Sequence, residues 1–254
     1  MNEGRSTEII ILGTIHSGHF EAKHYTAQAV KDILLALKPD AICVELYSRF
    51  FNPDGTLTEE AISFQNCPEV QATNEAATEL GVRQIPFDRE GRDELLAETN
   101  YFERERKWYA QFQEWSDRLQ ENAPHSDDCR LVCIWKRLLE SQLQLNSLAT
   151  PDVMNSPAYD GVIYARHSLE YVLAEAMKKD LEMQESAEFL EMDTGMWQER
   201  NRIMADNLVR IAADFSGARL VVPTGAEHRY ILRELLSEKP GIVLREYWEV
   251  LGDG

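Results

Sequence analysis

Ionisable side chains follow four short apolar stretches of this sequence, each at the point where the stretch ends. His16 follows residues 7–13 (TEIIILG), Glu45 closes residues 40–46 (DAICVEL), Asp88 ends residues 82–88 (VRQIPFD), and His228 follows residues 218–225 (ARLVVPTG). Imidazole and carboxylate groups serve as general acids and bases in enzymes and as ligands of divalent metals. These groups predict a catalytic or metal site if the fold brings the four ends together.

The order of apolar stretches and helical patterns along the chain predicts that the ends of the four apolar stretches lie together. Helical apolar spacing covers residues 27–40, 67–81 and 226–240, which alternate with the four apolar stretches. Strands that are apolar on both faces and separated by helices form parallel sheets. Two parallel strands run in the same direction, so the chain must cross back over the sheet between them, usually as a helix. We predict an α/β fold with a mostly parallel sheet flanked by helices, in which residues 241–250 form an edge strand. Ligands bind at the carboxyl edge of such sheets.

The middle of the chain, from about residue 90 to 215, lacks strand patterns and is rich in helix-forming residues. We predict one α/β domain over residues 1–254, with a core from 1–95 and 195–254 and a helical insertion over 96–194. A group of aromatic residues in the insertion predicts a packed helical core or a homodimer surface, or else a lid over an apolar substrate pocket. These residues are Tyr101, Phe102, Trp108, Tyr109, Phe112, Trp115 and Trp135.

The composition excludes several classes of partner. The net charge of −18, from 44 acidic and 26 basic residues, repels nucleic acids and anionic membrane surfaces. No segment reaches the roughly 18 continuous apolar residues that a membrane span requires, and the first residues lack the pattern of a secretory signal. We therefore expect a cytoplasmic protein, with its four cysteines reduced and partly buried because their spacing matches no zinc knuckle.

The predicted edge of the sheet permits two kinds of chemistry. His16, Glu45 and His228 are candidate ligands of one divalent cation, because imidazole with carboxylate suits Mn, Zn, Co or Fe. Without a metal, one histidine would act as a general base on water, an acidic residue would orient it, and an arginine would stabilise the oxyanion. His19 is predicted to face solvent or to support the site from outside.

Five short motifs, in this order, resemble those of the TraB/GumN/TIKI family. They are GTIH after the first strand, VELYSR at the second, IPFDR at the third, ERNRIMADNL in the late helix and GAEH after the fourth strand. Members of the family carry a GxxH, a glutamate followed by arginine, a DR pair, an ERN and a second GxxH. The resemblance covers both ends of the chain and hardly touches its helical middle.

The resemblance implies a set of site residues and a range of activities. The residues are His16, Glu45, Arg49, Asp88, Arg89, Glu199, Arg200, Asn201 and His228, with Gly225 in the second GxxH. The family is similar to the erythromycin esterase and ChaN-like proteins, which implies a related α/β fold with a polar cleft. TIKI-like members are regarded as metal-dependent proteases, TraB-like members act in peptide pheromone shutdown, and the esterases hydrolyse a lactone. Esterase-type relatives carry a glutamate where this chain has Gly13, which puts their mechanism in doubt here.

These observations predict a hydrolase of peptide or ester bonds at the carboxyl edge of the sheet, in which His16 and His228 act alone or through one divalent metal, with Glu45 as ligand or base. Arg49, Arg89 and Arg200 would bind an anionic group of a small-molecule or peptide substrate or stabilise an oxyanion. The alternatives are a non-catalytic module that binds a peptide or small anion at the same edge, and a protein that binds metal or haem iron without hydrolysis.

Overall fold

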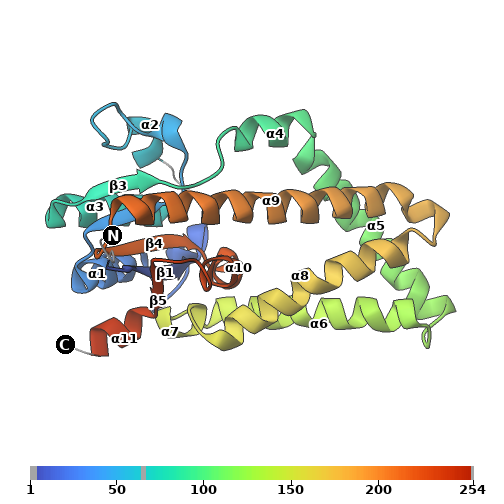
Figure 1. Cartoon of the computed structure of the whole chain (residues 1–254). Helices are drawn as coiled ribbons and strands as arrows, with labels where there is room; N and C mark the ends of the chain where they lie inside the picture. The colour runs from blue at the N-terminus through green and yellow to red at the C-terminus, as the bar shows by residue number, and fades with distance from the viewer. Residues whose placement is uncertain (1–4, 64–66, 253–254) are drawn as a thin grey trace. The chain divides into compact units, whose positions relative to one another are not determined.

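The computed structural model describes residues 5–63 and 67–252, and within them the chain forms a parallel sheet of five strands (Figure 1). The strands are β1 (Thr7–Thr14), β2 (Ala41–Val44), β3 (Arg83–Pro86), β4 (Arg219–Gly225) and β5 (Ile242–Arg245). Their order is β3-β2-β4-β1-β5, and every neighbouring pair is parallel. The predicted parallel α/β fold is confirmed, with β5 at one edge of the sheet.

The last strand is shorter than predicted. β5 ends at Arg245, and Tyr247–Gly252 forms helix α11 in place of the rest of the predicted strand. The carboxylate of Glu249 accepts a hydrogen bond from the backbone N–H of Glu246 at 2.9 Å. The chain turns into a helix here because an acidic side chain satisfies a donor that no helical carbonyl reaches.

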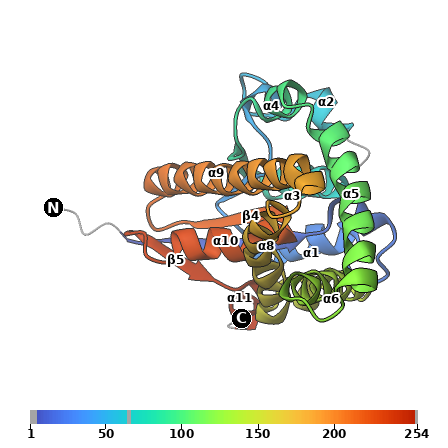
Figure 2. The ribbon, with the colours of Figure 1, turned by 90° about the vertical axis from the view of Figure 1, so that its right-hand side faces the viewer.

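Helices cover both faces of the sheet. Two helices pack on one face of the sheet, against alternate residues of the strands. They are α9 (Gln184–Asp214), which contributes its residues from 200 onward, and α10 (Ala226–Leu236). The buried core there includes Ile9, Ile11, Leu220, Val222, Met204, Leu208, Leu232 and Leu236. Ile10 and Leu12 point to the opposite face because side chains alternate along a strand, and both are fully buried. Figure 2 shows α10 next to β4 and β5, which it contacts.

The remaining helices of this part of the chain connect the strands. They are η1 (His16–Phe20), α1 (Ala27–Leu37), η2 (Ser48–Phe50), α2 (Glu59–Ile62), α3 (Pro68–Leu80) and α7 (Pro151–Met154). Local signals set the bounds of the longer ones. The Thr26 hydroxyl accepts from the N–H of Ala29 at the start of α1, while Pro68 begins α3 and Gly81 ends it with a φ of 67°.

The chain divides into two compact units. The first combines residues 1–90, 145–160 and 200–254, and the second combines 91–144 and 161–199. The segment 145–160, which the sequence assigned to the insertion, belongs to the unit that contains the sheet. Met154 is fully buried there, and the side-chain oxygen of Asn155 accepts a hydrogen bond from the N–H of Gly13 at 2.7 Å.

The second unit is built from α4 (Arg92–Glu98), α5 (Tyr101–Asn122), η3 (Leu181–Met183) and the parts of α6 (Asp127–Ser147), α8 (Pro157–Met177) and α9 that fall within it. Four of the aromatic residues noted in the sequence, Trp108, Phe112, Trp115 and Trp135, lie in its buried core, while Phe102 and Tyr109 are exposed. Helix packing therefore accounts for those four. Across the described residues, no helix has the length and apolar character needed to cross a membrane.

Gly13, at the end of β1, lies against the start of α10. A Cβ atom on Gly13 would lie 3.1 Å from the Cα of Ala226 and 3.2 Å from the carbonyl oxygen of Met154. The Tyr25 hydroxyl also donates to the carbonyl oxygen of Gly13 at 2.6 Å. A side chain at this position would therefore require Ala226 or the backbone of Met154 to shift by a few tenths of an ångström.

We expect a Gly13→Ala variant to lose about 1–3 kcal/mol of unfolding free energy, the usual cost of overpacking a core. Gly161, within α8, is a matched control because a Cβ there would meet nothing within 4 Å. Gly161→Ala should gain about 0.5–1 kcal/mol by restricting the unfolded chain. Urea unfolding of both variants measures the difference, and an equal response would contradict the close approach at Gly13.

Candidate functional site

Four ionisable groups predicted from the sequence lie at the carboxyl edge of the sheet. His16 begins η1 after β1, Glu45 follows β2, Asp88 lies two residues beyond β3, and His228 lies in the first turn of α10, after β4. Asp88 and His228 are buried. Because all the strands are parallel, their carboxyl ends share one edge of the sheet.

The guanidinium of Arg200, on α9, joins three of these groups. Its Nε and Nη2 donate to the two carboxylate oxygens of Asp88, each at 2.8 Å. Nη2 also donates to Oε1 of Glu45 at 2.6 Å, and Nη1 donates to Nε2 of His228 at 3.0 Å. Every nitrogen of the guanidinium therefore has a protein partner, so Arg200 orients the site and leaves no nitrogen for a substrate.

The carboxylate of Glu45 lies at the N-terminus of α10. Its Oε2 accepts hydrogen bonds from the Thr224 hydroxyl at 2.6 Å and from the backbone N–H of Gly225 at 2.7 Å. Burial alone would raise the pKa of Glu45, but the neighbouring basic groups His228, Arg200 and His16, together with the Thr224 hydroxyl, hold that pKa well below its usual value. Glu45 is thus an ionised cap that satisfies the positive end of the helix.

His228 is a neutral imidazole in this network. A guanidinium can only donate, so Nε2 of His228 accepts from Arg200, and the ring proton lies on Nδ1. Nδ1 then donates to Oδ1 of Asn201 at 2.7 Å. Burial, with the positive charge of Arg200, lowers the pKa of His228 to about 3. Its Nε2 lone pair is occupied by Arg200, so His228 is not a ready metal ligand.

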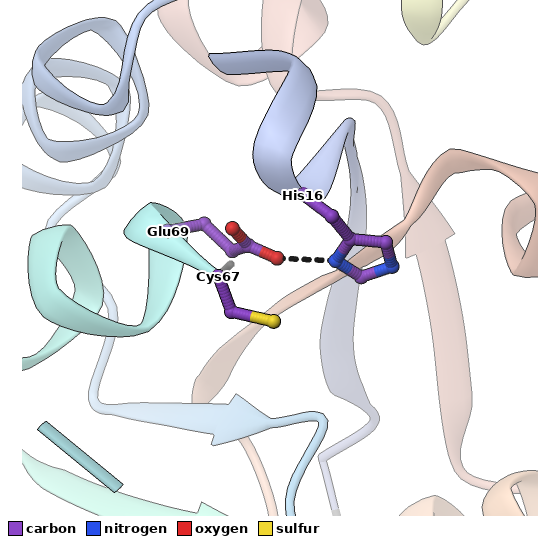
Figure 3. Close-up of side chains that lie close together, drawn as sticks. All are labelled: His16, Cys67 and Glu69. Carbon is purple, nitrogen blue, oxygen red and sulfur yellow. Dashed lines mark hydrogen bonds and ion pairs between the residues drawn. The ribbon is translucent and has the colours of Figure 1, made fainter. Parts of the chain in front are cut away.

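A second group lies beside this network. His16, Cys67 and Glu69 each offer one ligand atom within 4.8 Å of the others, and they are the one such group of three or more among the described residues. Nδ1 of His16 pairs with Oε1 of Glu69. Figure 3 shows the Cys67 thiol and the Glu69 carboxylate, both at the start of α3, on the same side of the His16 ring.

Glu69 is the buried member of this group. Its side chain is 8% exposed, and its Oε2 has no hydrogen-bond partner in the described part of the chain. A buried carboxylate oxygen without a partner costs free energy unless a cation or water satisfies it. The side chain of His16 is 46% exposed, so one side of the group faces solvent.

The His16 ring is held from two directions. Burial opposes its charge, but contacts with Cys67 and Glu69 and the nearby charge of Glu45 raise the pKa of His16 well above its usual value. On the other side of the ring, a Cβ on Gly225 would lie only 2.6 Å from Nε2 of His16. Gly225 therefore makes room for the imidazole. His16 has a φ of 46°, a conformation that few residues other than glycine adopt.

The structure thus contains a group of residues that could hold a metal ion, and it differs from the predicted set of ligands. The sequence predicted His16, Glu45 and His228 as ligands, and the group found shares only His16 with that set. The sequence predicts an ordinary reduced cysteine at Cys67 and no role for Glu69. The run Cys67-Pro68-Glu69 at a helix start was an available signal, because proline at the first helical position places its neighbours in the first turn.

Other predicted site residues lie outside both groups. Arg49 lies over the rings of Tyr47 and Phe50 and 3.7 Å from a carboxylate oxygen of Glu60. Arg89 lines a separate cavity, and Glu199 is exposed and falls in the second unit. His19 is buried, accepts at Nε2 from the N–H of Ile15 at 3.2 Å, and donates from Nδ1 to the carbonyl oxygen of Tyr25. It supports the loop and does not reach the site.

The pH dependence of folding should report the state of His228. An unfolded histidine binds a proton near pH 6.5, whereas folded His228 does so only near pH 3, so the contribution of His228 to stability falls as the pH drops between these values. Between pH 7 and pH 5 this loss amounts to about 2 kcal/mol. Glu45 weakens folding in the same direction only at lower pH, because its unfolded pKa is about 4.3.

Urea unfolding at pH 7 and pH 5 tests this expectation. A His228→Gln variant should show a smaller difference between the two pH values than the unchanged protein, and a His24→Gln variant should not. If His228→Gln keeps the full difference, the neutral imidazole is not its source.

Comparison of this chain with protein-family models, curated proteins and solved structures found no match. The resemblance to the TraB/GumN/TIKI family therefore stays a prediction from its short motifs.

Proposed function

We propose that this protein is a hydrolase of peptide or ester bonds that uses one zinc-type divalent metal held by His16, Cys67 and Glu69. One observation carries the proposal: three ligand atoms of different chemistry lie within 4.8 Å of one another, and the buried carboxylate among them keeps one oxygen without a partner. A cation between the three groups would satisfy that oxygen.

The chemistry of the ligands indicates which metal would bind. A thiolate selects Zn, Co or Fe, whereas Mg and Ca prefer oxygen ligands alone. Three protein ligands are the number found in catalytic zinc sites, where the fourth position is left for water or substrate. Such a site lowers the pKa of a coordinated water to about 7, which is the chemistry that the metal would supply. The exposed side of His16 gives substrate a way in.

The Arg200 network would serve this site by positioning. Glu45 holds the N–H of Gly225, and Gly225 lies against the ring of His16. Arg200 in turn fixes Glu45 against Asp88 and His228. The residues from the predicted motifs would therefore set the place of His16, while Cys67 and Glu69 would complete the metal site.

Metal binding by purified protein tests the site. We expect close to one zinc per chain by elemental analysis, and an affinity lower by about tenfold or more in Cys67→Ser, since even supporting residues of metal sites contribute that much. Cys133→Ser is the matched control, because Cys133 is also a half-buried free cysteine. Equal zinc affinity in both variants would rule out the proposed ligand set.

Activity tests the reaction. We expect the zinc-loaded protein to cleave members of a panel of peptides and esters, and the chelated protein to lose this turnover and regain it with zinc. Zinc binding without turnover on any member of the panel would instead support a non-catalytic metal-binding or peptide-binding module.

A further inference from the structure

A cavity of about 490 Å³ lies in the first unit, between the end of β3 and the part of α9 that packs on the sheet. Its lining consists of Pro86, Asp88, Arg89, Glu90, Ile203, Asn207, Arg210, Ile211 and Asp214. Pockets for small molecules in proteins have volumes of roughly 300–1,000 Å³, so the cavity is large enough for a small ligand. None of its lining residues belongs to the group of His16, Cys67 and Glu69.

Four charged side chains of this cavity form no ion pair with any described residue. The guanidinium of Arg89 and the carboxylate of Asp214 form no hydrogen bond within the described ranges either. Arg210 donates only to the neutral amide oxygen of Asn207, and Glu90 accepts only the backbone N–H of Ser48, at 2.8 Å. The fifth charged residue, Asp88, is already neutralised by Arg200.

The sequence spacing of the charged residues on α9 does not explain why Arg210 and Asp214 lack an ion pair. Arg202 and Asp206 are four residues apart on α9 and form a salt bridge of 2.9 Å. Arg210 and Asp214 have the same spacing on the same helix, yet they do not pair with each other and both line the cavity. The cavity therefore presents two cations and two anions to whatever enters it.

We propose that this cavity binds a small zwitterion of the amino-acid or short-peptide class. Arg89 and Arg210 bind its carboxylate, since guanidinium groups match carboxylates in shape and charge. Glu90 and Asp214 bind its ammonium group. Pro86, Ile203 and Ile211 contact its apolar side chains. A dianion is disfavoured, because it would meet two carboxylates in a protein whose net charge is already −18.

Calorimetric titration with the dipeptide leucyl-leucine, its N-acetyl derivative and its amide tests the proposal. The free dipeptide should bind, and each blocked form should bind at least about tenfold more weakly, because each loses its ionic contacts with one of the two pairs of charged side chains. Arg210→Gln should weaken binding of the dipeptide by a similar factor. Arg202→Gln, on the same helix but outside the cavity, should leave it unchanged.

Equal binding of the dipeptide and its N-acetyl form would overturn the zwitterion proposal in favour of a simple anion site. No binding of the dipeptide, or an equal loss in Arg210→Gln and Arg202→Gln, would overturn the site itself. The inference goes beyond the proposed hydrolase and does not depend on it. Titration of His16→Ala protein separates the two, because that variant lacks a proposed metal ligand and should bind the dipeptide normally.

Discussion

One guanidinium holds the carboxyl edge of this sheet together. Arg200, on α9, donates hydrogen bonds to Asp88 beyond β3, to Glu45 after β2 and to His228 on α10. One side chain therefore links the segments that follow three different strands. The two carboxylates are 3% and 13% exposed, and without a cation between them they would repel each other at low dielectric. Their approach therefore requires Arg200.

The contacts of Arg200 give the residues at the carboxyl edge of the sheet different charge states. Glu45 is ionised because Arg200 and the start of α10 both favour its charge, and His228 is neutral because Arg200 already occupies its Nε2. These side chains satisfy one another. Of the four groups that follow the strands, His16 is the most exposed, at 46%, and its partners Cys67 and Glu69 come from a different helix.

The sequence predicted the elements of this edge better than it predicted their contacts. Apolar strands, helical spacing and the residue after each strand were enough to place His16, Glu45, Asp88 and His228 at one edge, because parallel strands leave no other arrangement. The pairing of His16 with Glu69 depends on how closely α3 packs beside η1, which no local pattern contains. In the same way, the contacts of Arg200 depend on the rotation of α9 over the sheet, and the end of β5 depended on one capping carboxylate, Glu249.

The glycines of the two GxxH motifs have a reciprocal arrangement. Gly13, from the first motif, gives space to Ala226 of the second, and Gly225, from the second, gives space to His16 of the first. Each glycine therefore protects the geometry of the other motif. In evolutionary terms, a side chain gained at one glycine would press on the other motif and would need a smaller residue or a shifted backbone there, so we expect substitutions in the two motifs to be coupled.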